Sequence, residues 1–415
     1  MEKVQLFGMP AEKGRWLLIP LSITILLCLG TVYSWSIFRK PLEKLLNVGA
    51  TDSLLPFTVL LVVFAILMPI TGFYINRFDT RLITGVGGLI TALGYILSSL
   101  GGNIPTLTIT YGVIAGMGVG IAYGVPLAVV AKWFPDKKGL AVGATVIGFG
   151  LSPLITAPLA KFLIDAFGVR QTFVILGIAF AAIITAISTI LTTPPQGWQP
   201  EGWTPPVAIK ANSHTTTSGS ILQTSSFYGL WFCYTIGSFA GLAAIGISSP
   251  LAQEIIKLDA ATAANTVSLF AVFNGAGRLF FGWFTDKFTP KLGAIVSFVF
   301  ILIASIMMLS AGKGSVLTYI VAFSLFYLAL GGWLAIAPTS TLIIFQPQDY
   351  AKNYGIVFTA YGMGALGGTL LAGKIRDIFG SYTNFFYPTA GLAIVGIILA
   401  VFTLKRTSSD ADLVT

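Results

Sequence analysis

The stretch SLFAVFNGAGRLFFGWFTDK, residues 268–287, decides the fold of this chain. It is apolar and long enough to cross a membrane as a helix, but Arg278 lies inside it. A charged side chain at membrane depth costs about 3 kcal/mol or more. Asp286, at the end of the run, is about 12 Å away along a helix that rises 1.5 Å per residue. We therefore expect Arg278 to face a water-filled cavity and to bind a carboxylate there, rather than to pair with a loop acid or extend to the interface.

The composition extends this interpretation to the whole chain. Of the 415 residues, 55% are hydrophobic and 9% are charged, whereas soluble domains carry about 25% charged residues. The pattern predicts an all-α membrane protein, and we expect it to be a monomer surrounded by lipid. Apolar runs of about 20 residues predict twelve membrane-spanning helices: 15–38, 54–76, 82–102, 105–133, 139–165, 171–192, 226–252, 260–285, 291–312, 315–345, 351–375 and 382–404.

Charge and sequence repeats predict the topology. The net charge of +9 lies mostly in short gaps between apolar runs, which does not favour nucleic-acid binding. With both termini cytoplasmic, the inner segments hold 14 Lys and Arg residues and the outer segments hold 9. GFYINRFDTR (72–81) matches GWFTDKFTPK (282–291), and DAFG (165–168) matches DIFG (377–380), at nearly one offset. We therefore predict two pseudo-symmetric six-helix halves, 1–192 and 226–415, joined by a cytoplasmic linker, 193–225.

The polar residues give no pattern of catalysis or metal binding. The one histidine, His214, lies in a Ser/Thr-rich segment, and Cys28 and Cys233 lie in separate apolar runs. We find no nucleophile–base pair or set of metal ligands within the spans, so we expect neither an enzyme nor a cofactor-dependent protein.

Several motifs resemble known transporters. The loops after spans two and eight are similar to the signature loops of the major facilitator superfamily. Further motifs resemble its oxalate/formate antiporter branch, which is related to the proton-linked monocarboxylate transporters, including bacterial L-lactate carriers. These motifs are VYSWSIF (32–38), AGMGVGIAYG (115–124), KWFPDKKGLAVG (132–143), FNGAGRLFFGWFTDK (273–287) and KNYGIVFTAYGMGALGG (352–368). The resemblance implies a carrier in a bacterial inner membrane that works by alternating access.

The resemblance also implies gating loops. In the second copy of the loop, Asp286 and Lys287 stand where the superfamily places its gating ion pair. The first copy departs from the pattern, because Asn76 occupies the usual aspartate position beside Arg77 and Arg81.

The same resemblance places the substrate site. It assigns the anion-binding role to Arg278, with Asn274 one helical turn away on the same face. Asn274 stands where animal monocarboxylate carriers have a titrating aspartate. Tyr361 stands where the antiporter has a second cation, a lysine. One cation in the site favours a substrate with one negative charge. Tyr33 and Tyr123 match aromatic positions of the antiporter's cavity. Tyr327 and Phe358 could close over a small substrate.

Proton coupling has weaker support from the sequence. No acid lies in the middle of a span, and the nearest candidates are Glu254 and Asp259. The substrate could also carry the proton itself. We predict proton-coupled symport of a small monocarboxylate such as L-lactate, pyruvate or acetate. An oxalate/formate-type antiporter and a non-transporting carboxylate sensor stay open as alternatives.

Overall fold

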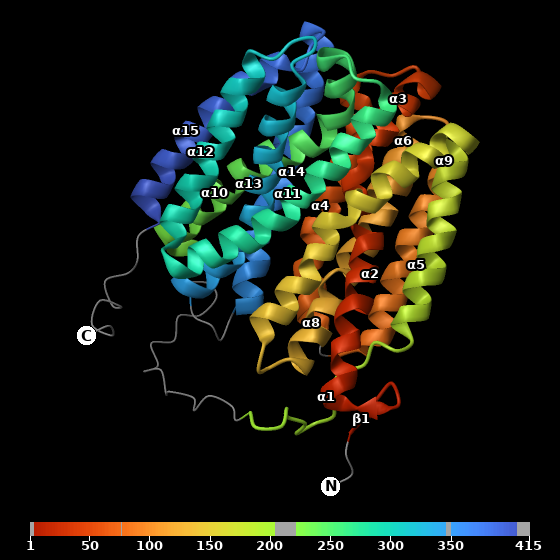
Figure 1. Cartoon of the computed structure of the whole chain (residues 1–415), viewed down its shortest axis with the longest axis vertical. Helices are drawn as coiled ribbons and strands as arrows, with labels where there is room; N and C mark the ends of the chain where they lie inside the picture. The colour runs from red at the N-terminus through yellow and green to blue at the C-terminus, as the bar shows by residue number, and fades with distance from the viewer. Residues whose placement is uncertain (1–3, 76, 204–220, 346–349, 405–415) are drawn as a thin grey trace.

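The computed structural model describes residues 4–75, 77–203, 221–345 and 350–404, and shows long helices packed side by side (Figure 1). A two-stranded antiparallel hairpin, β1 (Gln5–Leu6) and β2 (Met9–Pro10), comes first, with Leu6 paired to Met9. The helices of the first half follow: α1 (Ala11–Gly14), η1 (Arg15–Leu17), α2 (Leu18–Gly30), η2 (Thr31–Ser34), α3 (Trp35–Leu46), α4 (Ala50–Tyr74), α5 (Thr80–Ser98), α6 (Ile104–Leu107), η3 (Thr108–Ala115), α7 (Gly116–Ala122), α8 (Gly124–Trp133) and α9 (Lys138–Ser188).

The second half begins after the described end of the linker, which is not helical between residues 191 and 203. The predicted linker, 193–225, lies partly outside the described residues, as does His214, so the boundaries at 192 and 226 stay predictions. The helices of this half are η4 (Ile221–Gln223), α10 (Ser225–Leu251), η5 (Ala252–Ile256), α11 (Ala260–Lys287), α12 (Pro290–Leu309), α13 (Val316–Ile344), α14 (Tyr350–Phe379), η7 (Thr383–Phe385) and α15 (Phe386–Thr403).

The helix count agrees with the prediction. In the described residues, eleven helical runs are long and apolar enough to cross a membrane. One of them, α9, is 51 residues long and is interrupted at Gly168, whose φ of 79° and ψ of 166° are not helical. A positive φ is easily adopted by glycine, which has no Cβ. The two helices on either side of Gly168 correspond to the predicted spans 139–165 and 171–192, and the twelve-helix fold is confirmed.

Different polar contacts stabilise the two ends of the helix bundle. We call the end that carries α1 and the last turn of α15 the proximal face, and the opposite end the distal face (Figure 1). At the proximal face Arg15 donates to both carboxylate oxygens of Asp136, at 2.6 and 3.0 Å. This ion pair fixes the start of the first span to the loop before α9.

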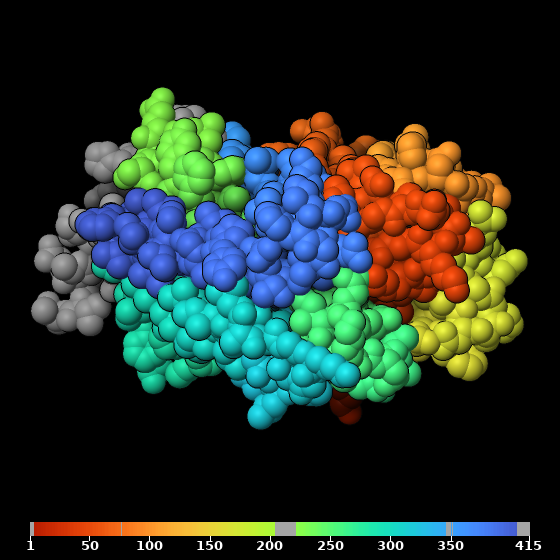
Figure 2. All heavy atoms as spheres, turned by 90° about the horizontal axis from the view of Figure 1, so that it is seen from above, coloured from red at the N-terminus to blue at the C-terminus, as the bar shows by residue number. Residues whose placement is uncertain are grey.

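The distal face is closed by polar contacts between the two halves. Arg39 is fully buried and donates to the Gly246 carbonyl at 3.1 Å and to the Tyr382 hydroxyl at 3.0 Å. Asp377 accepts from the amide groups of Ala50 and Thr51, each at 2.8 Å. Figure 2 views this face and shows blue atoms of the second half directly against orange-red atoms of the first half.

The first span continues farther than the sequence predicted. We expected it to end at residue 38, before Arg39 and Lys40, but α3 runs on to Leu46. The charge of Arg39 is tolerated there because its guanidinium also bonds Glu43 at 2.9 Å and Ser53 at 2.9 Å. A charge with a full set of partners need not end a helix.

Candidate substrate-binding site

Arg278 lies in α11, at the interface between the first and second halves of the protein. Its side chain is 5% exposed. One terminal nitrogen donates to the Val146 carbonyl of α9 at 3.0 Å, and the other reaches the Asn274 side-chain oxygen at 3.4 Å. The Nε atom has no hydrogen-bond partner. The guanidinium is therefore held only by neutral acceptors and keeps an unused donor.

Asn274 lies one helical turn before Arg278, as the sequence predicted, and its side chain is buried. Its amide nitrogen donates to the Tyr327 backbone carbonyl of α13 at 3.3 Å, while its oxygen accepts from Arg278. Both ends of the amide are thus engaged, and Asn274 ties Arg278 to the neighbouring helix. Gly150 of α9 faces this pair and leaves room for both side chains.

Aromatic side chains from both halves form a cluster beside Arg278. The hydroxyls of Tyr33 and Tyr361 are 2.7 Å apart and share a hydrogen bond between α14 and the first span. Phe358 stacks on Tyr361, with ring centroids 5.1 Å apart and planes 9° apart. Tyr123 lies within electrostatic reach of Arg278. These four predicted residues and Arg278 therefore belong to one cluster.

Tyr327 lies at the edge of this cluster. Its hydroxyl is 3.3 Å from the Ser248 hydroxyl, and its ring packs against Phe270. Its contact with the site is made through the backbone carbonyl that holds Asn274.

Several residues of the site were not recognised in the sequence. Phe64 and Phe149 pack edge-on against Tyr123, each with a centroid distance of 5.1 Å. Tyr234 of α10 lies near Phe358 and Tyr361. Only Gly150 could have drawn notice, because a glycine opposite an intramembrane arginine leaves space for it. A phenylalanine in an apolar run carries no signal that separates a site from a core.

The two predicted proton carriers lie near the distal face and away from Arg278. Glu254 forms ion pairs with Lys40 of the first half and with Arg376, whose Nε is 3.2 Å from the carboxylate. Asp259 is the N-cap of α11, and bonds from the Thr262 hydroxyl and from nearby amide groups lower its pKa. A lowered pKa makes Asp259 a poorer proton acceptor. The structure does not bring either acid to the cluster around Arg278.

The predicted gating residues lie at the proximal face, except for Asn76, which is outside the described residues. Arg77 lies over the Tyr74 ring at 5.5 Å, and Lys287 lies over the Trp283 ring at 5.1 Å. Asp286 is exposed. Within the described ranges, Arg77, Arg81, Asp286 and Lys287 form no ion pair.

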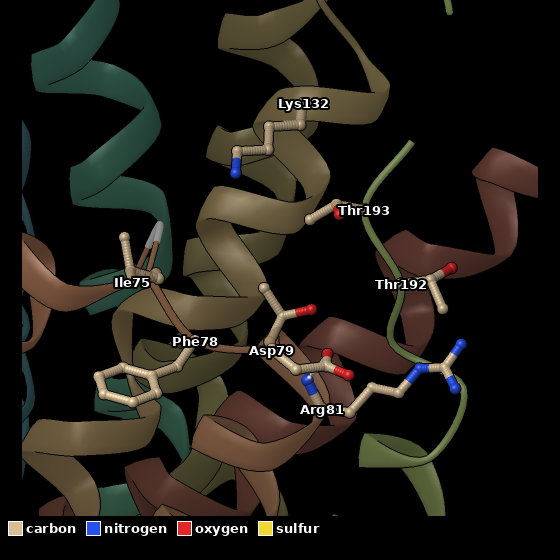
Figure 3. A pocket seen from close by; sticks show the side chains of 8 residues that line it. Ile75, Phe78, Asp79, Arg81, Lys132, Thr192 and Thr193 are labelled. Atoms are coloured by element: carbon tan, nitrogen blue, oxygen red, sulfur yellow. Dashed lines mark hydrogen bonds between the residues drawn. The ribbon is translucent and has the colours of Figure 1, made fainter. Parts of the chain in front are cut away.

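A polar pocket of about 470 Å³ opens beside Arg81 at the same face, apart from the Arg278 cluster (Figure 3). Its walls come from the start of α5, the end of α8 and the segment that follows α9. The lining residues are Ile75, Phe78, Asp79, Thr80, Arg81, Lys132, Thr192 and Thr193.

The buried cations set the chemistry of the site. Among the described residues, three cationic side chains are buried: Arg15, Arg39 and Arg278. Arg15 pairs with Asp136 and Arg39 pairs with Glu43, but Arg278 has no carboxylate partner. An unpaired charge in a low-dielectric setting favours the binding of an opposite charge. A twelve-helix fold with such a group between its two halves defines a membrane transporter.

The comparisons identify the family. The sequence profile of the Major Facilitator Superfamily matches residues 20–344 and, in a second match, residues 230–414. This chain therefore belongs to the Major Facilitator Superfamily, as its motifs suggested.

Two relatives of this chain are named for the transport of small organic anions. The oxalate:formate antiporter of Oxalobacter formigenes is 29% identical over 396 residues, which cover 95% of this chain and 92% of that protein. Monocarboxylate transporter 12 of Xenopus laevis is 24% identical over 339 residues, covering 77% of this chain and 73% of that protein.

Solved structures show the same fold. The crystal structure of a mutant of the nucleoside transporter NupG has a TM-score of 0.73 and 12% identity, and covers 94% of this chain and 100% of that chain. A bacterial homologue of the human lysosomal transporter Spinster, in an inward-facing and occupied conformation, has a TM-score of 0.71 and 14% identity, and covers 94% and 97%.

Proposed function

We propose that this protein is a proton-coupled symporter of small monocarboxylates. We propose L-lactate as its main substrate and pyruvate and acetate as further substrates. The observation that carries the proposal is Arg278, the one buried cation without a carboxylate partner among the residues that the structure describes. Its planar guanidinium suits a carboxylate, because two parallel hydrogen bonds can form.

The charge of the site favours one carboxylate over two. Tyr361 stands where a second cation would be needed, and its hydroxyl is bonded to Tyr33. A bound dianion such as oxalate would leave one carboxylate without a positive partner in a buried setting, which is strongly unfavourable. This argument favours a monocarboxylate carrier over an oxalate/formate antiporter.

The surroundings of Arg278 suggest how a small acid lies in the site. The carboxylate meets the guanidinium, beside Asn274 and Tyr123. The methyl group packs on the rings of Phe358 and Tyr361, which offer a flat apolar surface. Transport follows when the two halves rock against each other around this site.

The proposal includes a topology and a route for the proton. The proximal face is cytoplasmic, as the distribution of Lys and Arg favours, and the membrane is a bacterial inner membrane. Because no acid among the described residues forms an ion pair with Arg278, the proton crosses either on the substrate or through Glu254.

Uptake into liposomes tests the proposal. Carrier liposomes with a neutral interior and an acidic exterior should accumulate labelled L-lactate, and collapse of the pH gradient should stop accumulation. Arg278→Ala should abolish uptake, whereas Arg170→Ala, which removes an exposed arginine, should not. Normal uptake by Arg278→Ala would refute the site. Faster oxalate/formate exchange than lactate uptake would refute the symporter in favour of the antiporter. Binding without flux would favour a sensor.

A further inference from the structure

Tyr234 is a buried tyrosine whose hydroxyl has no hydrogen-bond partner. It lies in α10 and its side chain is fully buried. The ring stacks on Trp333 with a centroid distance of 5.9 Å and an angle of 19° between planes. An unpaired buried hydroxyl is unfavourable and is uncommon in proteins unless a ligand or water completes it.

The position of Tyr234 connects it to the Arg278 cluster. Its ring centroid is 6.4 Å from that of Phe358 and 6.5 Å from that of Tyr361. Its hydroxyl lies within electrostatic reach of Tyr33, Tyr123 and Arg278, and the neighbouring Tyr354 hydroxyl is not in hydrogen-bonding geometry with it. The unpaired hydroxyl therefore belongs to the same cluster as the predicted substrate residues.

The other polar groups of the cluster already have partners. The hydroxyls of Tyr33 and Tyr361 bond each other, and both ends of the Asn274 amide are engaged. Tyr123 lies within electrostatic reach of Arg278. Besides Tyr234, the groups left without a partner are the Nε atom of Arg278, which suits the carboxylate, and the indole nitrogen of Trp333, on which Tyr234 stacks. The Tyr234 hydroxyl is then available for the rest of the substrate.

We propose that Tyr234 binds the hydroxyl or keto oxygen at C2 of the substrate and so selects 2-hydroxy and 2-keto acids over unsubstituted acids of the same length. A phenolic hydroxyl can donate to a keto oxygen and can either donate to or accept from a hydroxyl group. This inference rests on the proposed function.

The substitution Tyr234→Phe tests the inference, because it removes the hydroxyl and keeps the ring that stacks on Trp333. The two probes are L-lactate and propionate, which differ by the 2-hydroxyl. The affinity of Tyr234→Phe for lactate should fall by about 5- to 15-fold, since a net hydrogen bond contributes about 1–1.5 kcal/mol. Its affinity for propionate should stay within about twofold of the wild-type value on the same grounds.

Two further measurements separate binding from structure. The melting temperature of the ligand-free Tyr234→Phe carrier should not fall, because the lost hydroxyl has no partner. Tyr319→Phe is the control: this buried hydroxyl donates to the Ser248 carbonyl, and its loss should leave the lactate-to-propionate affinity ratio unchanged.

The outcomes distinguish the two proposals. An equal loss for lactate and propionate, or no loss for either, would refute the role of Tyr234 and leave the proposed function standing. Failure of the wild-type carrier to bind either acid would refute both.

Discussion

The contact between Gly150 and the Arg278 site allows a sharp prediction about substrate affinity. A Cβ atom at Gly150 would lie 2.4 Å from the Asn274 side-chain oxygen and 3.1 Å from Arg278 Nε. The same helix supplies the Val146 carbonyl that accepts from Arg278 at 3.0 Å. Gly150→Ala should therefore displace the guanidinium from the position in which it meets a carboxylate.

The expected size of the effect follows from how firmly the neighbours are held. Asn274 is fixed by the Tyr327 carbonyl, and Arg278 by Val146, so neither side chain can give way without losing a bond. Overpacking of this kind costs about 1–3 kcal/mol. If this penalty falls on the bound state, lactate affinity drops by about 5- to 150-fold.

The assay compares Gly150→Ala with Gly143→Ala in the same helix, since a Cβ at Gly143 meets nothing within 4 Å. Both changes replace a helical glycine, which by itself favours the helix by about 1 kcal/mol. The difference between the two variants therefore isolates the contact with Asn274 and Arg278. Equal lactate KM values for Gly150→Ala and Gly143→Ala would refute the reasoning.

Two further predictions concern the ends of the bundle. Glu254→Gln should weaken the pairing with Lys40 across the distal face. The distance between spin labels attached at Leu45→Cys and Leu317→Cys should then shift to longer values. An unchanged distance distribution would contradict this prediction. Asp136→Asn should lower the melting temperature by a few degrees at neutral pH, because bonds from Arg15 hold the pKa of Asp136 below its usual value. A lowered pKa contributes stability above the ordinary aspartate pKa of about 3.9, and that contribution is lost as the pH falls through the lowered value. The difference from wild type should therefore disappear in acid, and a constant difference would contradict the pairing.

The sequence was sufficient for the features that depend on apolar length and on single unusual residues. Runs of about 20 apolar residues set the helices, and Arg278 was recognised because an intramembrane charge is rare. The break at Gly168 falls in the predicted gap between spans five and six. In these cases the signal lies within a few turns of one helix.

The distal contacts could not be predicted because their partners are far apart in the chain. Arg39 meets Gly246 and Tyr382, which are 207 and 343 positions away. The sequence made Glu254 a candidate proton carrier, and the structure places it between Lys40 and Arg376. Charges in the gaps between spans predict which side of the membrane they face, but not which charge of the other half they meet.

A comparison of the buried arginines Arg39 and Arg278 shows why burial alone does not mark a binding site. Arg39 is fully buried and its charge is matched by Glu43, so the group is satisfied and holds the distal face together. Arg278 is nearly as buried, but its acceptors are the Val146 carbonyl and the Asn274 amide, which orient the guanidinium without neutralising it. A buried cation that is oriented and not neutralised favours an incoming anion. The pairing of the charge therefore separates the structural arginine from the one that we propose binds the substrate.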